Sequence, residues 1–131
     1  MTHEITETEY GLRFTHDGRP TAADLETFCT DARRAVDDQP GAFGVLSDQR
    51  ELEVFPRDAT DELGQLMKHA KQSGLTRSVA LVGSVTSQLQ IDRLVEQSRG
   101  GDHSVVVQAG EHDDPVHVAR RWIEDGVEPP D

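Results

Sequence analysis

Short apolar runs alternate with helical patterns in the second half of the chain, and this alternation limits the fold more than any other feature. The run VALV at 79–82 stops at Gly83, and a helical pattern of apolar residues follows over 86–99. The same order recurs at 105–107 and 115–125. Apolar runs without polar alternation are typical of parallel strands buried on both faces. Strands that alternate with helices predict a mostly parallel sheet with right-handed crossovers.

The first half of the chain adds two polar strands and a capped helix. Loose alternation around a glycine predicts two short strands, or one bent strand, within 5–15, and the sequence HDG at 16–18 predicts a closing turn. The polarity of these strands favours an edge of the sheet. A helix follows over 21–38, where Thr21 and Asp24 have the spacing of a capping box.

The middle of the chain supplies a further strand and helix. The apolar run at 43–47 predicts a buried strand with Asp48 and Arg50 at its carboxyl end. A connection at 51–57 leads to a second helix over 58–73. The expected order is therefore β-β-α-β-α-β-α-β-α. We expect an α/β fold with a single, mostly parallel sheet of four to five strands and four helices.

Length and composition fit one domain over 1–131, with a core at about 4–125 and a frayed tail at 126–131. The N-terminus is polar and acidic, and no apolar stretch approaches the roughly 20 residues that span a bilayer. We therefore expect no signal peptide and no membrane span. Cys29 is the single cysteine, so an internal disulfide is impossible and a cytoplasmic location is expected. Its helical spacing makes Cys29 a core residue rather than a nucleophile.

The charge balance is strongly acidic. The formal net charge is −12, and the basic residues comprise eleven arginines and two lysines. An acidic, lysine-poor composition resembles that of proteins from extreme halophiles, in which molar salt screens the repulsion between like charges. An ordinary acidic protein is the alternative. No basic stripe is visible, and this argues against nucleic-acid binding.

Three segments resemble a known family. They are the sequences GVLSDQR at 44–50, RSVALVGSVTSQLQIDRL at 77–94 and HDDPVHVARRWIED at 112–125. Together they resemble small SpoIIAA-like (STAS-like) domains, loosely grouped with Sec14-type folds. The resemblance implies a non-enzymatic interaction or regulatory domain. In anti-sigma-factor antagonists of this group a Ser or Thr at the start of the second helix is phosphorylated. Thr60 is the nearest hydroxyl here, although the family's glycine is missing.

Ligands of open parallel sheets collect outside the carboxyl ends of the strands. The residues expected to converge there form one crevice for a ligand or partner: Asp48, Arg50, Gly83, Ser84, Thr86 and Ser87. The turn at 83–87 offers N–H groups and hydroxyls to an anion, but it lacks the lysine and glycine spacing of a P-loop. A turn-and-cap role is the alternative. Asp48 as a catalytic acid or base would need a titratable partner, and the sequence supplies none.

No metal or cofactor site is expected. His103, His112 and His117 stand near aspartates, but their spacing matches no compact ligand motif. The prediction is therefore no catalytic residue, no metal and no cofactor.

Two functional hypotheses follow from the sequence. The first is a protein-interaction module that binds a partner or itself as a homodimer. It rests on the helix at 86–99, which we expect to bury Leu89, Leu94 and Val95, and whose apolar residues spread wider than one face when Ile91 is included. The second is a small-ligand domain, for a lipid-like or acidic molecule, that uses the crevice near Arg50 and Ser84.

Overall fold

The computed structural model describes residues 3–57, 60–98 and 103–130. It confirms the predicted order and class. Five strands are formed by β1 (His3–Glu7), β2 (Gly11–Gly18), β3 (Phe43–Leu52), β4 (Leu75–Val82) and β5 (Ser104–Gln108). The helices are α1 (Ala22–Asp37), α2 (Thr60–Gln72), α3 (Val85–Ser98) and α4 (Pro115–Asp125), with a short 3-10 turn, η3 (Ala109–Glu111), before α4.

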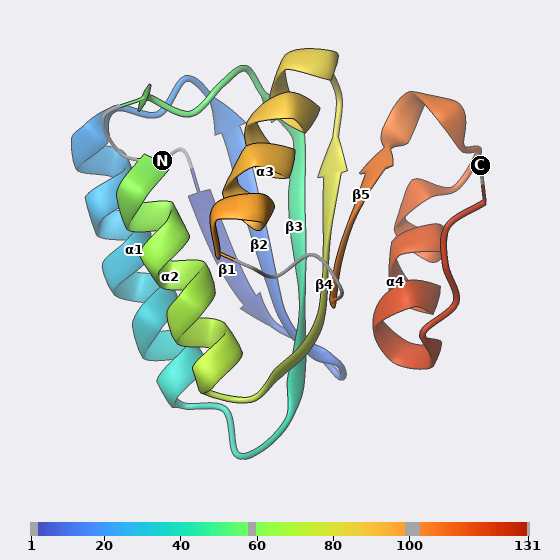
Figure 1. Ribbon diagram of the computed structural model, residues 1–131, viewed down its shortest axis with the longest axis horizontal. Helices are drawn as coiled ribbons and strands as arrows, with labels where there is room; N and C mark the ends of the chain where they lie inside the picture. The colour runs from blue at the N-terminus through green and yellow to red at the C-terminus, as the bar shows by residue number, and fades with distance from the viewer. Residues whose placement is uncertain (1–2, 58–59, 99–102, 131) are drawn as a thin grey trace.

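The strands form one sheet in the order β1-β2-β3-β4-β5. Only β1 runs antiparallel to its neighbour; the other three pairs are parallel. Helices α1, α2 and α3 cover one face of the sheet and α4 covers the other (Figure 1). The polar strand β1 lies at an edge, as its composition indicates.

Successive side chains of a strand point to opposite faces, so the sheet separates two hydrophobic clusters. On β3, Val45 belongs to the cluster under α1, α2 and α3, whereas Leu46 belongs to the cluster under α4. Trp122 of α4 packs in the second cluster, and its indole N–H donates to the carbonyl of Ser78 over 2.9 Å. Helix α4 contacts β3, β4 and β5, and therefore lies over the half of the sheet that these strands form.

Local capping signals are confirmed at two helices. The Thr21 hydroxyl accepts from the backbone N–H of Asp24, and the Asp24 carboxylate accepts from the N–H of Thr21. At α4, Asp114 caps the N-terminus, Pro115 opens the helix, and Gly126 ends it in the left-handed conformation at φ +70°. Each of these residues lies within a few positions of the helix end that it determines.

Two strand boundaries differ from the prediction. Residues 16–18 are not a turn, because β2 continues through them and pairs with β3 after a bulge between Thr15 and Asp17. The strand β3 extends to Leu52, so residues 48–50 lie within it rather than at its end. Asp48 and Arg50 are accommodated within the strand because their side chains bond to each other and, through Asp48, to Arg13 of β2.

The helical phase of α3 also differs from the prediction. Ile91 is buried, whereas Leu89 is 61% exposed and Val85 is 69% exposed. Ser87 lies one turn before Ile91 and is fully buried, so the buried stripe follows these two residues. The predicted burial of Leu94 and Val95 lies outside the described side chains.

Candidate functional site

Asp48 forms the centre of an ion-pair cluster on the face of the sheet that also carries α4. Its Oδ2 accepts from Nη2 of Arg13 over 2.8 Å and from Nη2 of Arg50 over 2.7 Å. Its Oδ1 accepts from Nε of Arg50 over 2.9 Å and from the backbone N–H of Arg50 over 3.2 Å. Arg50 stands two residues further along β3 and Arg13 lies on the neighbouring β2, so all three side chains share one face.

This geometry keeps Asp48 ionised. Burial alone would raise the pKa of the carboxyl group, but the hydrogen bonds from Arg50 and Arg13 outweigh burial and lower the pKa to about 2. Both arginines are partly exposed, while Asp48 is buried. A carboxylate held by two guanidinium groups is a poor proton acceptor at neutral pH, so the cluster stabilises the sheet rather than preparing a general base.

We expect Asp48→Asn to lower the free energy of unfolding by about 2 kcal/mol at pH 7, because the amide cannot match the charged bonds to both arginines. Urea unfolding measures the loss. The folded pKa lies below the unfolded one, so this stabilisation is present above pH 4 and disappears as the pH falls towards 2. Glu53→Gln is the matched control, since its ion pair with Arg19 is exposed and contributes under about 1 kcal/mol. Equal stability of wild type and Asp48→Asn at pH 7 would contradict this role.

The turn after β4 shows how the predicted strand-end residues meet. The hydroxyl of Ser84 accepts from the backbone N–H of Ser87 over 3.1 Å, which caps α3. Gly83 passes so close to β3 that an added Cβ would lie 2.6 Å from the carbonyl oxygen of Arg50. From β5, Gln108 donates to the carbonyl of Ser84 over 3.4 Å. The strand ends therefore come together, and their polar groups bond to one another.

Two further predicted residues stand apart from this turn. Thr86 is exposed on the first turn of α3. Thr60 begins α2, and its hydroxyl donates to the carbonyl of Arg57 over 2.9 Å. Asp58 and Ala59, which precede it in the candidate phosphorylation motif, lie outside the described residues. Phosphorylation of Thr60 stays a prediction.

The single cysteine and the possible metal ligands were the other candidates for chemistry. Cys29 is buried in the core, as its spacing predicts, and burial first, with Glu62 nearby, raises the pKa of its thiol to about 11. A thiol in this state is a weak nucleophile. Within 3–57, 60–98 and 103–130, no group of three or more His, Cys, Asp or Glu side chains is placed to hold a metal ion.

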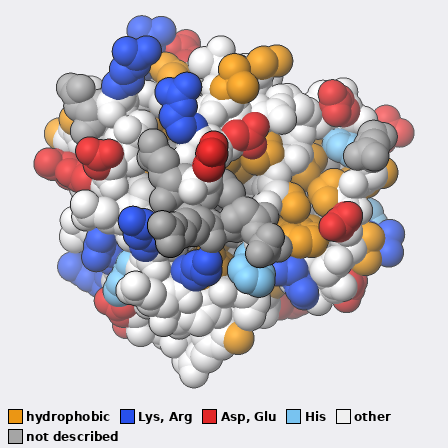
Figure 2. Space-filling view, viewed as in Figure 1, with side chains coloured by type: hydrophobic (Ala, Val, Ile, Leu, Met, Phe, Trp, Pro, Cys, Tyr) orange, Lys and Arg blue, Asp and Glu red, His pale blue; other side chains and the backbone are white. Residues whose placement is uncertain are grey.

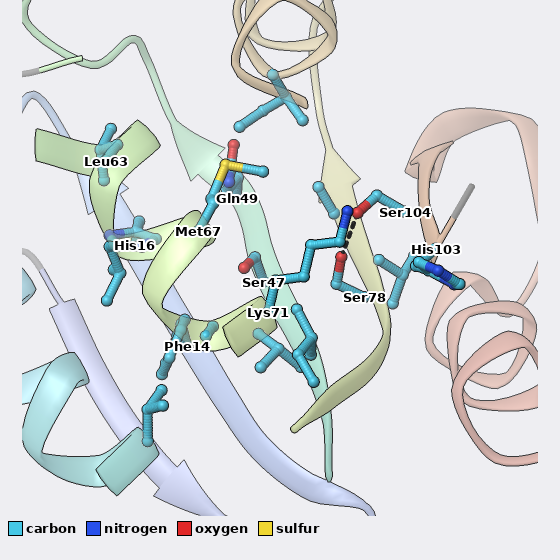
Figure 3. A pocket seen from close by; sticks show the side chains of 18 of the residues that line it. Phe14, His16, Ser47, Gln49, Leu63, Met67, Lys71, Ser78, His103 and Ser104 are labelled. Atoms are coloured by element: carbon cyan, nitrogen blue, oxygen red, sulfur yellow. Dashed lines mark hydrogen bonds between the residues drawn. The ribbon is translucent and has the colours of Figure 1, made fainter. Parts of the chain in front are cut away.

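A cavity of about 120 Å³ lies elsewhere, between the sheet and helices α2 and α3 (Figure 3). Its floor contains small side chains in the middle of the sheet, since Ser47 of β3 is paired with Ala80 of β4. Three phenylalanines, Phe14, Phe28 and Phe55, contribute to its walls. The residues of this site are separated in the chain and carry no motif, so the sequence does not predict it.

Comparison with solved structures identifies the class of fold. The chain resembles the structure of an anti-sigma-factor antagonist (STAS) domain protein from Planctomyces limnophilus, with a TM-score of 0.55 and 15% sequence identity. The likeness covers 83% of this chain and 92% of that one. No protein-family model matches the sequence, and no curated protein matches it. The chain therefore has a STAS-like α/β fold, as the resemblance in its sequence implies.

Among the described helices, none combines the length and the apolar character that crossing a bilayer requires.

Proposed function

We propose that this protein is a non-enzymatic interaction module that acts in the cytoplasm of a salt-adapted cell by binding a second copy of itself or another protein. The STAS-like fold supports a regulatory or interaction role. The observation that carries the proposal is an exposed apolar pair at the start of α3. We call Val85 and Leu89 the α3 patch.

The α3 patch has the geometry of a docking stripe. Val85 and Leu89 lie one helical turn apart and are 69% and 61% exposed. Asp92 and Glu96 continue the same stripe and are exposed. Hydrophobic side chains reach the surface over this end of α3 (Figure 2). An apolar pair followed by two acids suits a partner surface that carries apolar side chains, with basic ones further along.

The chemistry of the described interior supports a role without catalysis. The carboxylate of Asp48 is held by two arginines, and the thiol of Cys29 is buried with a raised pKa. The alternative of ligand binding at Arg50 and Ser84 has weaker support, because the groups at the strand ends bond to one another. The cytoplasmic and halophilic parts of the proposal rest on composition, with eleven arginines, two lysines and a net charge of −12.

Self-association is tested first. We expect the wild type to sediment as a dimer in molar KCl, where charge repulsion is screened, and Leu89→Ser to weaken the dimer tenfold or more. Burying a leucine contributes about 1.5–3 kcal/mol, which corresponds to roughly a tenfold to hundredfold change in affinity. Val127→Ser is the matched control, since Val127 is another exposed apolar residue on the tail after α4.

A wild type that stays monomeric at all concentrations would overturn self-association. Binding to another protein is then tested by cross-linking in cells at native salt. Cross-links that form equally well with wild type and Leu89→Ser would overturn the α3 patch as the interaction surface.

A further inference from the structure

The buried side chain of Gln49 has an unpaired oxygen. Gln49 is 3% exposed, and its Oε1 has no hydrogen-bond partner among the described residues. An unsatisfied buried carbonyl costs about 1–3 kcal/mol, so such groups are rare unless a ligand or water completes them. Gln49 lines the cavity between the sheet and α2. Figure 3 shows Gln49 and Ser47 projecting from β3 towards α2.

Most of the side chains that line the cavity are apolar. The hydrophobic side chains around the cavity come from the sheet, the helices and the loop after β3: Phe14, Phe28, Phe55, Leu63, Met67 and Ile91. His16 also lines the cavity, and burial lowers its pKa to about 4, so its ring is neutral at pH 7. A charged group placed here would lose its hydration without a counter-ion. The inner part of the cavity therefore selects a neutral, apolar molecule.

The mouth of the cavity is polar. Ser78 of β4 and Ser104 of β5 share a hydrogen bond of 2.7 Å between their hydroxyl oxygens. Lys71 of α2 extends towards these two serines (Figure 3). Lys71 is exposed, so the cavity reaches solvent on this polar side. Gln49 is buried and lies on β3, two residues beyond the floor residue Ser47.

The volume limits the size of the occupant. Pockets for drug-sized ligands measure roughly 300–1,000 Å³, whereas an engineered apolar cavity of about 150 Å³ binds benzene. At about 120 Å³ the cavity is too small for a long acyl chain and close to the size of one six-membered ring. It exists because Ser47 and Ala80, a paired position in the centre of the sheet, are both small.

We propose that this cavity is a binding site for a neutral, ring-sized apolar molecule that carries one hydrogen-bond donor, and that the donor bonds to Oε1 of Gln49. A phenol-like compound has this chemistry. The site is independent of the α3 patch, so either proposal can fail without the other.

The probes are phenol and toluene, which have nearly the same shape but differ in the donor. We expect both to perturb amide resonances of cavity-lining residues in ¹H–¹⁵N spectra of the wild type in molar KCl. Phenol should shift the side-chain amide resonances of Gln49 further than toluene does, because only its hydroxyl donates to Oε1, whereas both rings contribute a ring-current shift. This comparison needs no variant.

Variants then isolate the hydrogen bond. We expect Gln49→Met to lower the affinity for phenol relative to toluene about tenfold, because the phenol hydroxyl loses its acceptor. Gln65→Met is the matched control, since Gln65 is exposed on α2. Ala80→Leu should fill the cavity and abolish binding of both probes.

Three results would overturn the site. They are the absence of any perturbation by either probe in the wild type, an unchanged phenol-to-toluene ratio in a folded Gln49→Met, and full binding in a folded Ala80→Leu. If either variant fails to fold, the response of the Gln49 side-chain amide in the wild type decides, and equal shifts with phenol and toluene contradict the proposal.

Discussion

Replacing Phe28 with alanine is expected to lower the free energy of unfolding by about 3–5 kcal/mol, the range measured for large aromatic residues in protein cores. Phe28 of α1 is 2% exposed and packs edge-on against Phe14 at 5.2 Å and His16 at 4.4 Å between ring centroids. Alanine would remove these contacts and join the space left by the ring to the existing cavity, which Phe28 already lines.

Urea unfolding at constant molar KCl measures this loss. Phe28→Leu is the matched control, because it retains most of the apolar volume and should cost much less than the alanine variant. A loss under about 1.5 kcal/mol for Phe28→Ala would mean that the site collapses around the smaller side chain. That result would also argue against a preformed cavity beside it.

The helix ends could be predicted from the sequence because their causes are local. Thr21 and Asp24 satisfy each other's backbone N–H groups within one turn, and Asp114 and Gly126 act within three residues of the helix that they bound. Such signals need no knowledge of the rest of the fold.

The extent of β3 could not be predicted in this way. Asp48 and Arg50 have the composition of a loop, and the residue that completes their ion pair, Arg13, stands 35 positions before Asp48. Only the parallel pairing of β2 with β3 brings that guanidinium group to the carboxylate. A polar pair within a strand is stable when a neighbouring strand supplies the counter-charge, and the sequence does not show which strands are neighbours.

The candidate ligand site depends even more on pairing. Ser47 and Ala80 form a void only because the register of β3 and β4 places them opposite each other beneath the helices. A shift of one residue would turn every side chain of the strand to the other face. Neither residue carries a signal of its own, so the cavity follows from the assembled sheet and not from any motif.

The same cavity wall gives the protein a dependence on pH. His16 packs between Phe28 and Phe55, and burial first, then the nearby His3, lowers its pKa to about 4, although Asp48 opposes the shift. The unfolded chain, with a pKa near 6.5, takes up the proton first. The contribution of the neutral His16 to the free energy of unfolding is therefore fully present above pH 6.5. This contribution decreases as the pH falls below 6.5 and is lost as the pH drops through 4. The expected loss from this group is about 3 kcal/mol.

Urea unfolding of wild type and His16→Phe between pH 7 and pH 4 isolates this contribution. The acidic surface also loses charge over this range, but that change is common to both proteins. The difference between the two slopes of unfolding free energy against pH is therefore due to His16. We expect the wild type to lose about 3 kcal/mol more than His16→Phe. Parallel pH profiles would contradict a buried, neutral imidazole. The neutral inner surface that the proposed ring-sized ligand requires would then be wrong as well, because a protonated His16 would place a charge inside the cavity.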